Sequence, residues 1–298
     1  MAQQGNLKAH WCIFGVVITT FIVGVEVLHR TTRDQNLVYQ RRILIDKDLA
    51  ITEEPRAEES QPREVSFYER TRYGMLPKRQ RDNAKIFRAY SAQTNYDGKY
   101  VKAAILVEDA TVEKVKAIID TLKDSRVSFV IPHYAQDLSD IATAIISSGN
   151  EFFIQLPTQT SIPEDKQDRV SPFLANADPQ YTIDKLNYLI ASVKYAIGIA
   201  NTSSSLITKS PRNMKIIASE LSHRGLAFLN IEEDNEVLHN VLQDSHLLCL
   251  AAQQIGEISQ QPIVEKESVI INSSQLEDLL QKLPQSVRLM PISFKVNE

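Results

Sequence analysis

The sequence is poor in the residues from which many phosphate and redox sites are built. It has only nine glycines and two cysteines, and no glycine stands in the pattern of a phosphate-binding loop or a nucleophile elbow. Cys12 lies in an apolar run expected in lipid and Cys249 in a stretch expected in a core, so we predict no disulfide between them. The six histidines form no pair with metal-ligand spacing. Serine-type hydrolysis and nucleotide binding through a glycine loop are therefore not indicated.

The chain also lacks a strong charge of one sign. It carries 33 Lys and Arg against 37 Asp and Glu, for a net charge of −4 at pH 7. The basic excess lies in residues 1–95 and the acidic excess in residues 96–298. A net acidic body argues against nucleic acid as the main partner.

Only one apolar run, at residues 11–28, is long enough to suggest a membrane segment. Its length is near the lower limit for a spanning helix, and we predict an uncleaved N-terminal anchor over residues 1–30. A cleaved signal peptide is the main alternative, although no small-x-small pattern follows the run, and a buried soluble helix is a third. Arg30, Arg33, Arg41 and Arg42 favour a cytoplasmic location for the following residues, so the flanking charges do not settle the orientation.

Residues 31–95 are predicted to be a polar linker that ends in a lead-in arm. Charged residues, Pro55 and Pro62 dominate its first part, where too little apolar surface is available to offset the entropy cost of ordering. A patterned patch at 73–92 is predicted to pack on the folded domain. Its basic residues leave a membrane-surface patch as the alternative.

Strand patterns and helix patterns alternate from Val101 onward. Strands are expected at 101–108, 126–133, 151–157, 196–201, 226–230, 246–252, 268–272 and 287–294. Helices are expected at 111–123, 137–149, 183–195, 211–224, 234–244 and 274–283. This alternation predicts a mostly parallel sheet, either open and doubly wound or closed. The number of strands favours an α/β fold, a deformed (β/α) barrel over residues 96–298.

Polar side chains follow several of these strands, and parallel strands bring their carboxyl ends to one edge. The candidate site residues there are Glu108, Asp109, His133, Gln155, Asn201, Thr202 and Asn230. An acidic pair can supply one metal ligand and one general base. The alternative for Asp109 is that it caps the helix at 111–123. A lone histidine after a strand is more often structural than a ligand.

Six segments in order resemble the divergent polysaccharide deacetylase family, a bacterial group related to metal-dependent carbohydrate esterases. They are ILVEDA, FVIPHYAQDL, SSGNEFFIQLPTQ, AIGIANTSSSLIT, ELSHRGLAFLN and RLMPISF. The resemblance extends over about residues 73–298. It implies a deformed barrel of the deacetylase type, export or anchoring at the bacterial envelope, and a sugar deacetylation site.

The site residues depart from the pattern that this resemblance implies. An aspartate pair becomes Glu108-Asp109, and the histidine before Leu-Pro of the third strand becomes Gln155. The family's Asn-His passage becomes Asn201-Thr202, and its aspartate in an FLD passage becomes Asn230. Amide and hydroxyl groups hold a divalent transition metal weakly.

We therefore expect a single-pass protein of the bacterial inner membrane, with its body in the periplasm and catalysis lost or nearly lost. It would need no cofactor and would bind a glycan or an envelope protein through His133, Gln155, Asn201, Thr202 and Asn230. One alternative is an active deacetylase, with zinc held by Asp109 and His133 and with Glu108 and Asp109 as catalytic residues. Another is a purely structural membrane-tethered module.

Overall fold

The computed structural model describes residues 67–79, 84–157, 173–201, 205–232, 235–256, 265 and 267–296. They belong to a compact unit that runs from Val65 to Glu298. The predicted anchor at 11–28, the first part of the predicted linker and Thr202 lie outside the described residues. No helix within the described ranges is long and apolar enough to cross a membrane.

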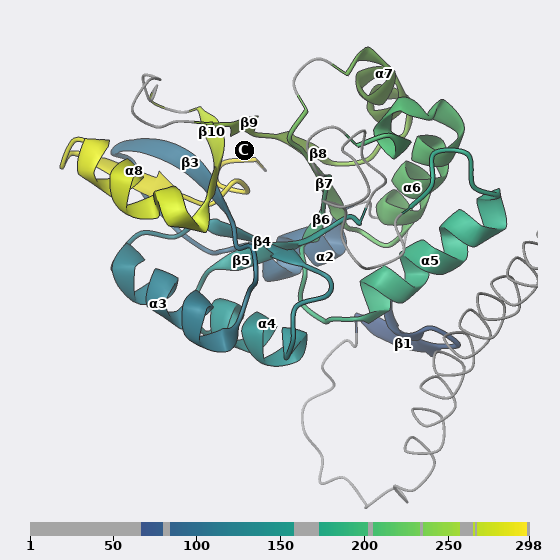
Figure 1. The fold of residues 1–298 in the computed structure, drawn as a ribbon, viewed down its shortest axis with the longest axis horizontal. Coiled ribbons are helices and arrows are strands. Elements are labelled where there is room, and N and C mark those ends of the chain that lie inside the picture. The colour runs from purple at the N-terminus through teal and green to yellow at the C-terminus, as the bar shows by residue number, and fades with distance from the viewer. Residues whose placement is uncertain are drawn as a thin grey trace, which may run out of the picture. The chain divides into compact units, whose positions relative to one another are not determined.

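A parallel sheet curls into a nearly closed ring at the centre of this unit (Figure 1). Its strands are hydrogen-bonded in the order β8, β7, β6, β5, β4, β3, β10, β9, and β11 also pairs with β3. The two ends of this order, β8 and β9, are separated in the chain by Ala252 alone. The strand bounds are Lys99–Leu106 (β3), Ser128–Pro132 (β4), Glu151–Gln155 (β5), Gly198–Ala200 (β6), Ala227–Asn230 (β7), Cys249–Ala251 (β8), Gln253–Gln254 (β9), Ser268–Asn272 (β10) and Val287–Met290 (β11).

Strand β3 has three parallel partners. It pairs with β10 along Lys102–Leu106, with β4 along Ala104–Leu106, and with β11 along its first half. Val101, Ala103, Ala104 and Ile105 are all buried, as expected for a parallel strand covered on both faces. The prediction of a buried parallel strand at 101–108 is therefore confirmed, but the strand ends at Leu106, before the acidic pair.

Alternate residues of the strands serve two separate cores. Ala103 and Ile105 pack outward with the helices, whereas Ala104 faces the ring interior with Val130, Phe153, Leu229 and Ile270. Small side chains are needed inside a narrow ring because its interior is filled by side chains. Position 198 in β6 requires glycine, because a Cβ there would lie 2.3 Å from the carbonyl oxygen of Ala227.

Helices lie outside the ring (Figure 1). They are Val112–Leu122 (α3), Leu138–Ser147 (α4), Pro179–Ala191 (α5), Pro211–His223 (α6), Glu236–Asp244 (α7) and Leu276–Lys282 (α8), with 3-10 turns at Ile207–Lys209 (η2) and Ser273–Gln275 (η3). The predicted ends of two helices are confirmed, because Gly149 and Gly225 follow α4 and α6 with φ of 78° and 70°.

Two helix starts differ from the sequence interpretation. The side chain of Thr111 caps α3 by accepting a hydrogen bond from the Lys114 amide at 3.2 Å, so the capping alternative for Asp109 is wrong. Helix α5 was expected at 183–195, but Asp178 accepts a hydrogen bond from the Gln180 amide at 2.8 Å and Pro179 occupies the first turn. This cap starts the helix four residues earlier than its apolar pattern indicates.

The lead-in arm packs on the barrel, as predicted. It consists of an antiparallel hairpin, Tyr68–Thr71 (β1) and Gly74–Pro77 (β2), followed by helix α2 at Lys85–Tyr90. Leu76 of the hairpin is fully buried, and Phe87 of α2 joins the ring interior. The Phe87 amide donates to the Gly225 carbonyl at 2.9 Å, just before β7. Helix α2 therefore covers the amino ends of the strands.

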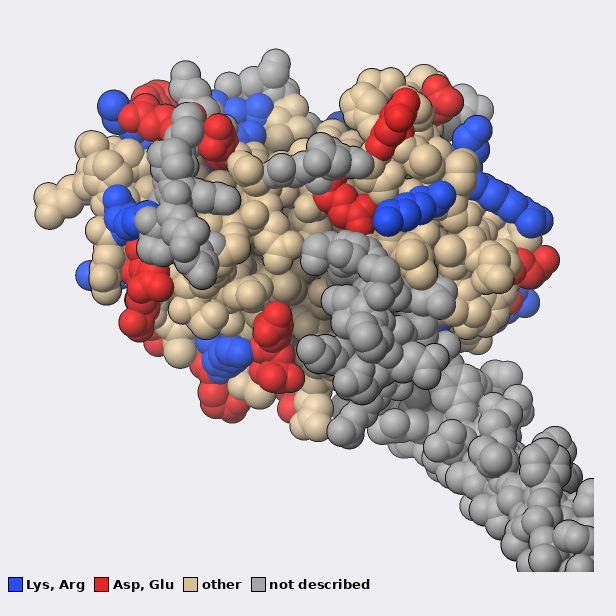
Figure 2. Space-filling view, turned by 45° about the horizontal axis from the view of Figure 1, so that its top comes forward, with Lys and Arg blue, Asp and Glu red and all other residues tan. Residues whose placement is uncertain are grey.

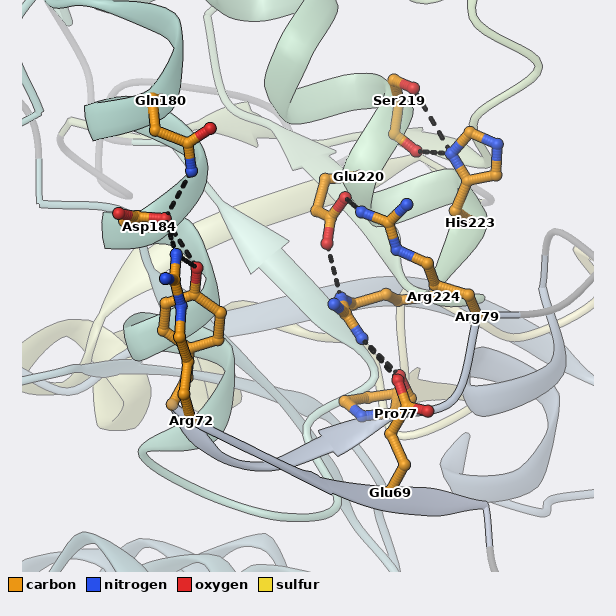
Figure 3. Close-up of polar contacts among 11 residues, drawn as sticks. Glu69, Arg72, Pro77, Arg79, Gln180, Asp184, Ser219, Glu220, His223 and Arg224 are labelled. Carbon is orange, nitrogen blue, oxygen red and sulfur yellow. Dashed lines mark hydrogen bonds and ion pairs between the residues drawn. The ribbon is translucent and has the colours of Figure 1, made fainter.

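Charged side chains join the hairpin to α5 and α6 (Figure 3). Arg224 donates to Glu220 at 2.7 Å and to the Pro77 carbonyl at 2.6 Å, and Arg79 also pairs with Glu220. Arg224 and Glu220 are both 5 % exposed. Asp184 of α5 accepts hydrogen bonds from residues 72 and 73 of the hairpin turn.

Candidate functional site

The predicted site residues follow strands that are direct neighbours in the ring. The strands β3, β4, β5, β6 and β7 are consecutive, so their carboxyl ends form one arc, which we call the barrel mouth. This arc carries Glu108, Asp109, His133, Gln155, Asn201 and Asn230. The structure thus brings the described members of the predicted set to one edge, although they do not form one connected cluster.

The acidic pair lies in a turn beyond β3. The Val107 amide makes a last hydrogen bond to the Val130 carbonyl at 3.1 Å, and the chain then leaves the sheet. Glu108 and Asp109 are exposed, and Asp109 has a φ of 47°, a left-handed conformation that aspartate tolerates in turns. Lys114 donates to the backbone carbonyl of Glu108. The carboxylates themselves face solvent.

Asn201 and Asn230 bind each other at the ends of β6 and β7. The Asn201 side-chain amide donates to Asn230 Oδ1 at 3.1 Å, and its own Oδ1 accepts from the Ile231 amide at 2.8 Å. Asn230 donates to the Glu232 carbonyl at 2.9 Å and accepts from the Glu232 amide at 3.0 Å. Asn201 is 1 % exposed. These amides therefore connect two strand ends.

Glu232, which the sequence interpretation missed, lies next to the asparagine pair. Its carboxylate accepts hydrogen bonds at 2.8 Å from the Ser205 amide, the Thr208 hydroxyl and the Asn235 side chain. These donors come from both the β6–α6 and β7–α7 connections. The acidic run IEED after β7 was the available signal, but its role depends on donors up to 27 residues away.

His133 is half-buried at the end of β4. Its Nε2 atom is buried and has no hydrogen-bond partner in the described part of the chain. Burial lowers the pKa of this imidazole to about 4, and the positive charge of Lys185 acts in the same direction. The ring makes an edge contact with Tyr134, with centroids 5.4 Å apart. His133 is therefore neutral at pH 7.

Aromatic rings surround the ammonium group of Lys185 in α5. Its Nζ lies 5.1 Å from the centre of the Phe173 ring and 5.6 Å from that of Tyr181, both within the range of cation–π attraction. Phe173 is 1 % exposed, and its amide donates to the Pro157 carbonyl at 2.7 Å, just after β5. Burial lowers the pKa of Lys185, and Tyr181 opposes this effect.

We call His133, Tyr134, Phe173, Tyr181 and Lys185 the mouth cluster. It joins the end of β4 to the start of α5. The sequence predicted only His133 of this set; Tyr134 is its neighbour in the chain, and Phe173, Tyr181 and Lys185 lie in a loop and a helix up to 52 positions further along. Gln155, the last residue of β5, is half-buried and pairs in register with Pro132 and Ala200.

The described donor set does not fit a zinc site. No group of three His, Cys, Asp or Glu residues gathers in a metal-binding arrangement within the described ranges. Between the acidic turn and Glu232 lie one imidazole, His133, the amide of Gln155, and the pair Asn201–Asn230, whose amides already hydrogen-bond each other. Structural and catalytic zinc sites use thiolate, imidazole or carboxylate ligands. The side chains described at the barrel mouth therefore do not supply the ligand set that zinc-dependent hydrolysis requires.

The comparison with family models decides the classification. The model for divergent polysaccharide deacetylases matches residues 105–255, slightly more than half of the chain, from β3 to just after β9. The chain belongs to the divergent polysaccharide deacetylase family. No match was found among curated proteins.

One solved structure supports the fold of this family member, and a second is similar over much of its length. An uncharacterized protein from Agrobacterium tumefaciens C58 aligns with a TM-score of 0.56 and 15 % identity, covering 74 % of this chain and 88 % of that one. A mutant of a CE4 family pseudoenzyme with restored enzymatic activity aligns at 11 % identity over 73 % of this chain and 70 % of that one. Its TM-score of 0.36 is too low to support an inference about this chain.

Charges of both signs are interspersed over the face of the chain that Figure 2 shows.

Cys249 of β8, which was expected in a core, is exposed. The stretch around it is only partly covered because β8 is short and lies at the end of the sheet order.

Proposed function

We propose that this member of the divergent polysaccharide deacetylase family binds a glycan at its barrel mouth and has lost, or nearly lost, metal-dependent catalysis. We further propose that residues 11–28 anchor it in the bacterial inner membrane with its body in the periplasm. The observation that supports the loss of catalysis is the hydrogen-bonded pair Asn201–Asn230. This pair occupies two strand ends of the mouth with groups that are poor ligands for a transition metal.

The physical argument concerns the activation of water. A catalytic metal lowers the pKa of a bound water only when its protein ligands hold it firmly and leave one position open. The amide oxygens of Asn201 and Asn230 already accept hydrogen bonds from the backbone. Binding a metal there would remove those bonds and leave buried donors without partners, which costs about 1–3 kcal/mol each.

Binding of a sugar is consistent with the chemistry of the same edge. Sugar sites combine a few polar groups with aromatic faces. The mouth offers the half-buried Gln155, the neutral His133, and two exposed rings, Tyr134 and Tyr181. Glu108 and Asp109 add exposed carboxylates that can accept hydrogen bonds from sugar hydroxyls.

The test is metal content and turnover of the purified full-length chain in detergent. We expect less than stoichiometric zinc after dialysis and no release of acetate from a chitooligosaccharide or a peptidoglycan fragment. Binding of one of these glycans should remain measurable by calorimetry. Stoichiometric zinc, or turnover that is lost in Asp109→Ala and kept in the control Asp124→Ala, would instead support the active deacetylase.

Localisation and partner need separate measurements. A reporter fused after residue 298 should be active in the periplasm, and a cytoplasmic signal would contradict both the location and the glycan hypothesis. If no glycan binds and crosslinking in membranes captures one stoichiometric envelope protein, the structural module becomes the better explanation.

A further inference from the structure

The mouth cluster is an unusual combination of a cation, exposed aromatic rings and an unsatisfied nitrogen. Tyr134 is 39 % exposed and Tyr181 is 43 % exposed, although large aromatic side chains normally bury most of their surface. Phe173, which contacts the Lys185 ammonium group, donates its amide to the Pro157 carbonyl just after β5, and β5 pairs with β4 up to Pro132, the residue before His133. The rings, the ammonium group and the imidazole therefore belong to one site between β4 and α5.

The cluster has an unmet polar requirement. The buried Nε2 of His133 has no hydrogen-bond partner in the described ranges, and such an atom costs about 1–3 kcal/mol if nothing satisfies it. Buried polar atoms of this kind need an explanation, of which a missing ligand is one. Because the imidazole is neutral, it can act as a hydrogen-bond donor or acceptor according to its tautomer.

Lys185 determines the charge that the site prefers. Its half-buried position reduces solvent screening, which strengthens attraction to an anion. Phe173 and Tyr181 hold its ammonium group through cation–π contacts, so the group is positioned before a ligand arrives. A cationic ligand would be repelled here.

Resting on the proposed glycan-binding function, we propose that the mouth cluster is a subsite for a carboxylate-bearing sugar. The sugar ring contacts the exposed faces of Tyr134 and Tyr181, and its carboxylate pairs with Lys185. A hydroxyl or carboxylate oxygen of the same residue supplies the partner that His133 Nε2 lacks.

The experiment compares two forms of one sugar. Calorimetry measures the binding of oligogalacturonate to the full-length chain, and of the same oligomer with its carboxyl groups methyl-esterified. We expect the esterified form to bind at least tenfold more weakly, equal to about 1.4 kcal/mol. A chitooligosaccharide serves as the neutral reference.

Variants separate charge from stacking. Lys185→Gln should abolish the preference for the acidic form, whereas Lys185→Arg should retain it and Lys194→Gln, a control just beyond the same helix, should leave it unchanged. Tyr134→Ala and Tyr181→Ala should weaken both forms. Thermal unfolding of each variant shows whether it is folded.

Each outcome decides a separate point. Equal binding of the acidic and esterified forms, or a preference that persists in Lys185→Gln, overturns the acidic subsite. Binding of the chitooligosaccharide without binding of oligogalacturonate overturns it too, but leaves the proposed glycan function intact. If no saccharide binds, both proposals fail.

Discussion

The amino end of the barrel holds a buried carboxylate that is fully hydrogen-bonded, whereas the mouth leaves some of its polar groups exposed or unsatisfied. At the amino end Glu151 is completely buried, yet it accepts hydrogen bonds from the Ser128 and Ser293 hydroxyls and from the Ala92 and Ser293 amides. At the mouth, the Glu108 and Asp109 carboxylates are exposed and His133 has a buried nitrogen without a partner in the described residues. The buried, satisfied acid therefore stabilises the fold, whereas the incompletely satisfied groups of the mouth, unlike the hydrogen-bonded Asn201, Asn230 and Glu232 beside them, are available to a ligand.

The largest effect should come from removing the Glu151 carboxylate. Burial raises the pKa of Glu151 and its hydrogen bonds oppose that shift. Glu151→Ala leaves several buried donors without an acceptor, and we expect a loss of about 3–5 kcal/mol in the free energy of unfolding. Urea denaturation of the full-length chain measures it.

Two matched variants make this test specific. Glu151→Gln keeps one acceptor oxygen and should lose less than Glu151→Ala. Asp109→Ala removes an exposed carboxylate and should change stability by no more than about 0.5 kcal/mol. Equal losses at positions 151 and 109 would remove the distinction between the two ends.

The next largest effect is expected at the ion pair that joins α6 to the arm. Glu220→Ala leaves Arg224, whose side chain is 5 % exposed, with only the more distant carboxylate of Glu69 at 3.6 Å, and should cost about 3 kcal/mol. Arg79→Ala removes the partner that is 56 % exposed and should cost less than about 1 kcal/mol. A double-mutant cycle of Glu220 and Arg224, measured by urea denaturation, gives the coupling energy of the buried pair. Additive losses would contradict such a pair.

The third effect is a dependence of folding stability on pH that comes from His133 at the mouth. The pKa of His133 in the folded state is about 4, below the ordinary histidine value of 6.5, so the unfolded chain takes up a proton first as pH falls. Folding stability should therefore decrease between pH 6.5 and 4, by about 1–2 kcal/mol once partial solvent screening is allowed for.

Substituting the imidazole separates this contribution from that of other groups. His133→Gln should be less sensitive to pH over that window in urea denaturation than the wild-type chain. His239→Gln, which replaces an exposed histidine of α7, should behave as the wild type. An unchanged pH profile in His133→Gln would show that the mouth does not disfavour the charged imidazole.

The smallest effect should come from the cap beside the acidic turn. Thr111→Ala removes the acceptor of the Lys114 amide and should cost about 1 kcal/mol. Thr121→Ala, an exposed change near the end of the same helix, is the control. In thermal unfolding, the midpoint temperature of Thr111→Ala should lie clearly below that of Thr121→Ala.

Sequence patterns were sufficient for features set by neighbouring residues. The β-branched run of β3, the glycines after α4 and α6, and the packing of the 73–92 patch all depend on local propensity and burial. Helix α5 starts at Pro179 and not at the predicted residue 183, because the cap Asp178 and Pro179 begin the helix before its apolar pattern does. That signal was present in the sequence.

The content of the site was less predictable, because it depends on contacts between distant segments. Gln155, Asn201 and Asn230 could be placed at one edge by counting strands. The mutual hydrogen bond of the two asparagines, the three donors to Glu232, and the position of Lys185 beside His133 depend on how the loops cross the edge, which no local pattern encodes.

The pairing of β3 has a consequence for the order in which the chain can fold. One edge of β3 pairs with β10, and its first residues pair with β11, whose bounds end at Met290. Contacts of such sequence separation form slowly, and an unpaired strand edge invites association with other chains. During synthesis β3 therefore keeps an open edge until β11 has emerged, and the growing chain must be protected from aggregation until then.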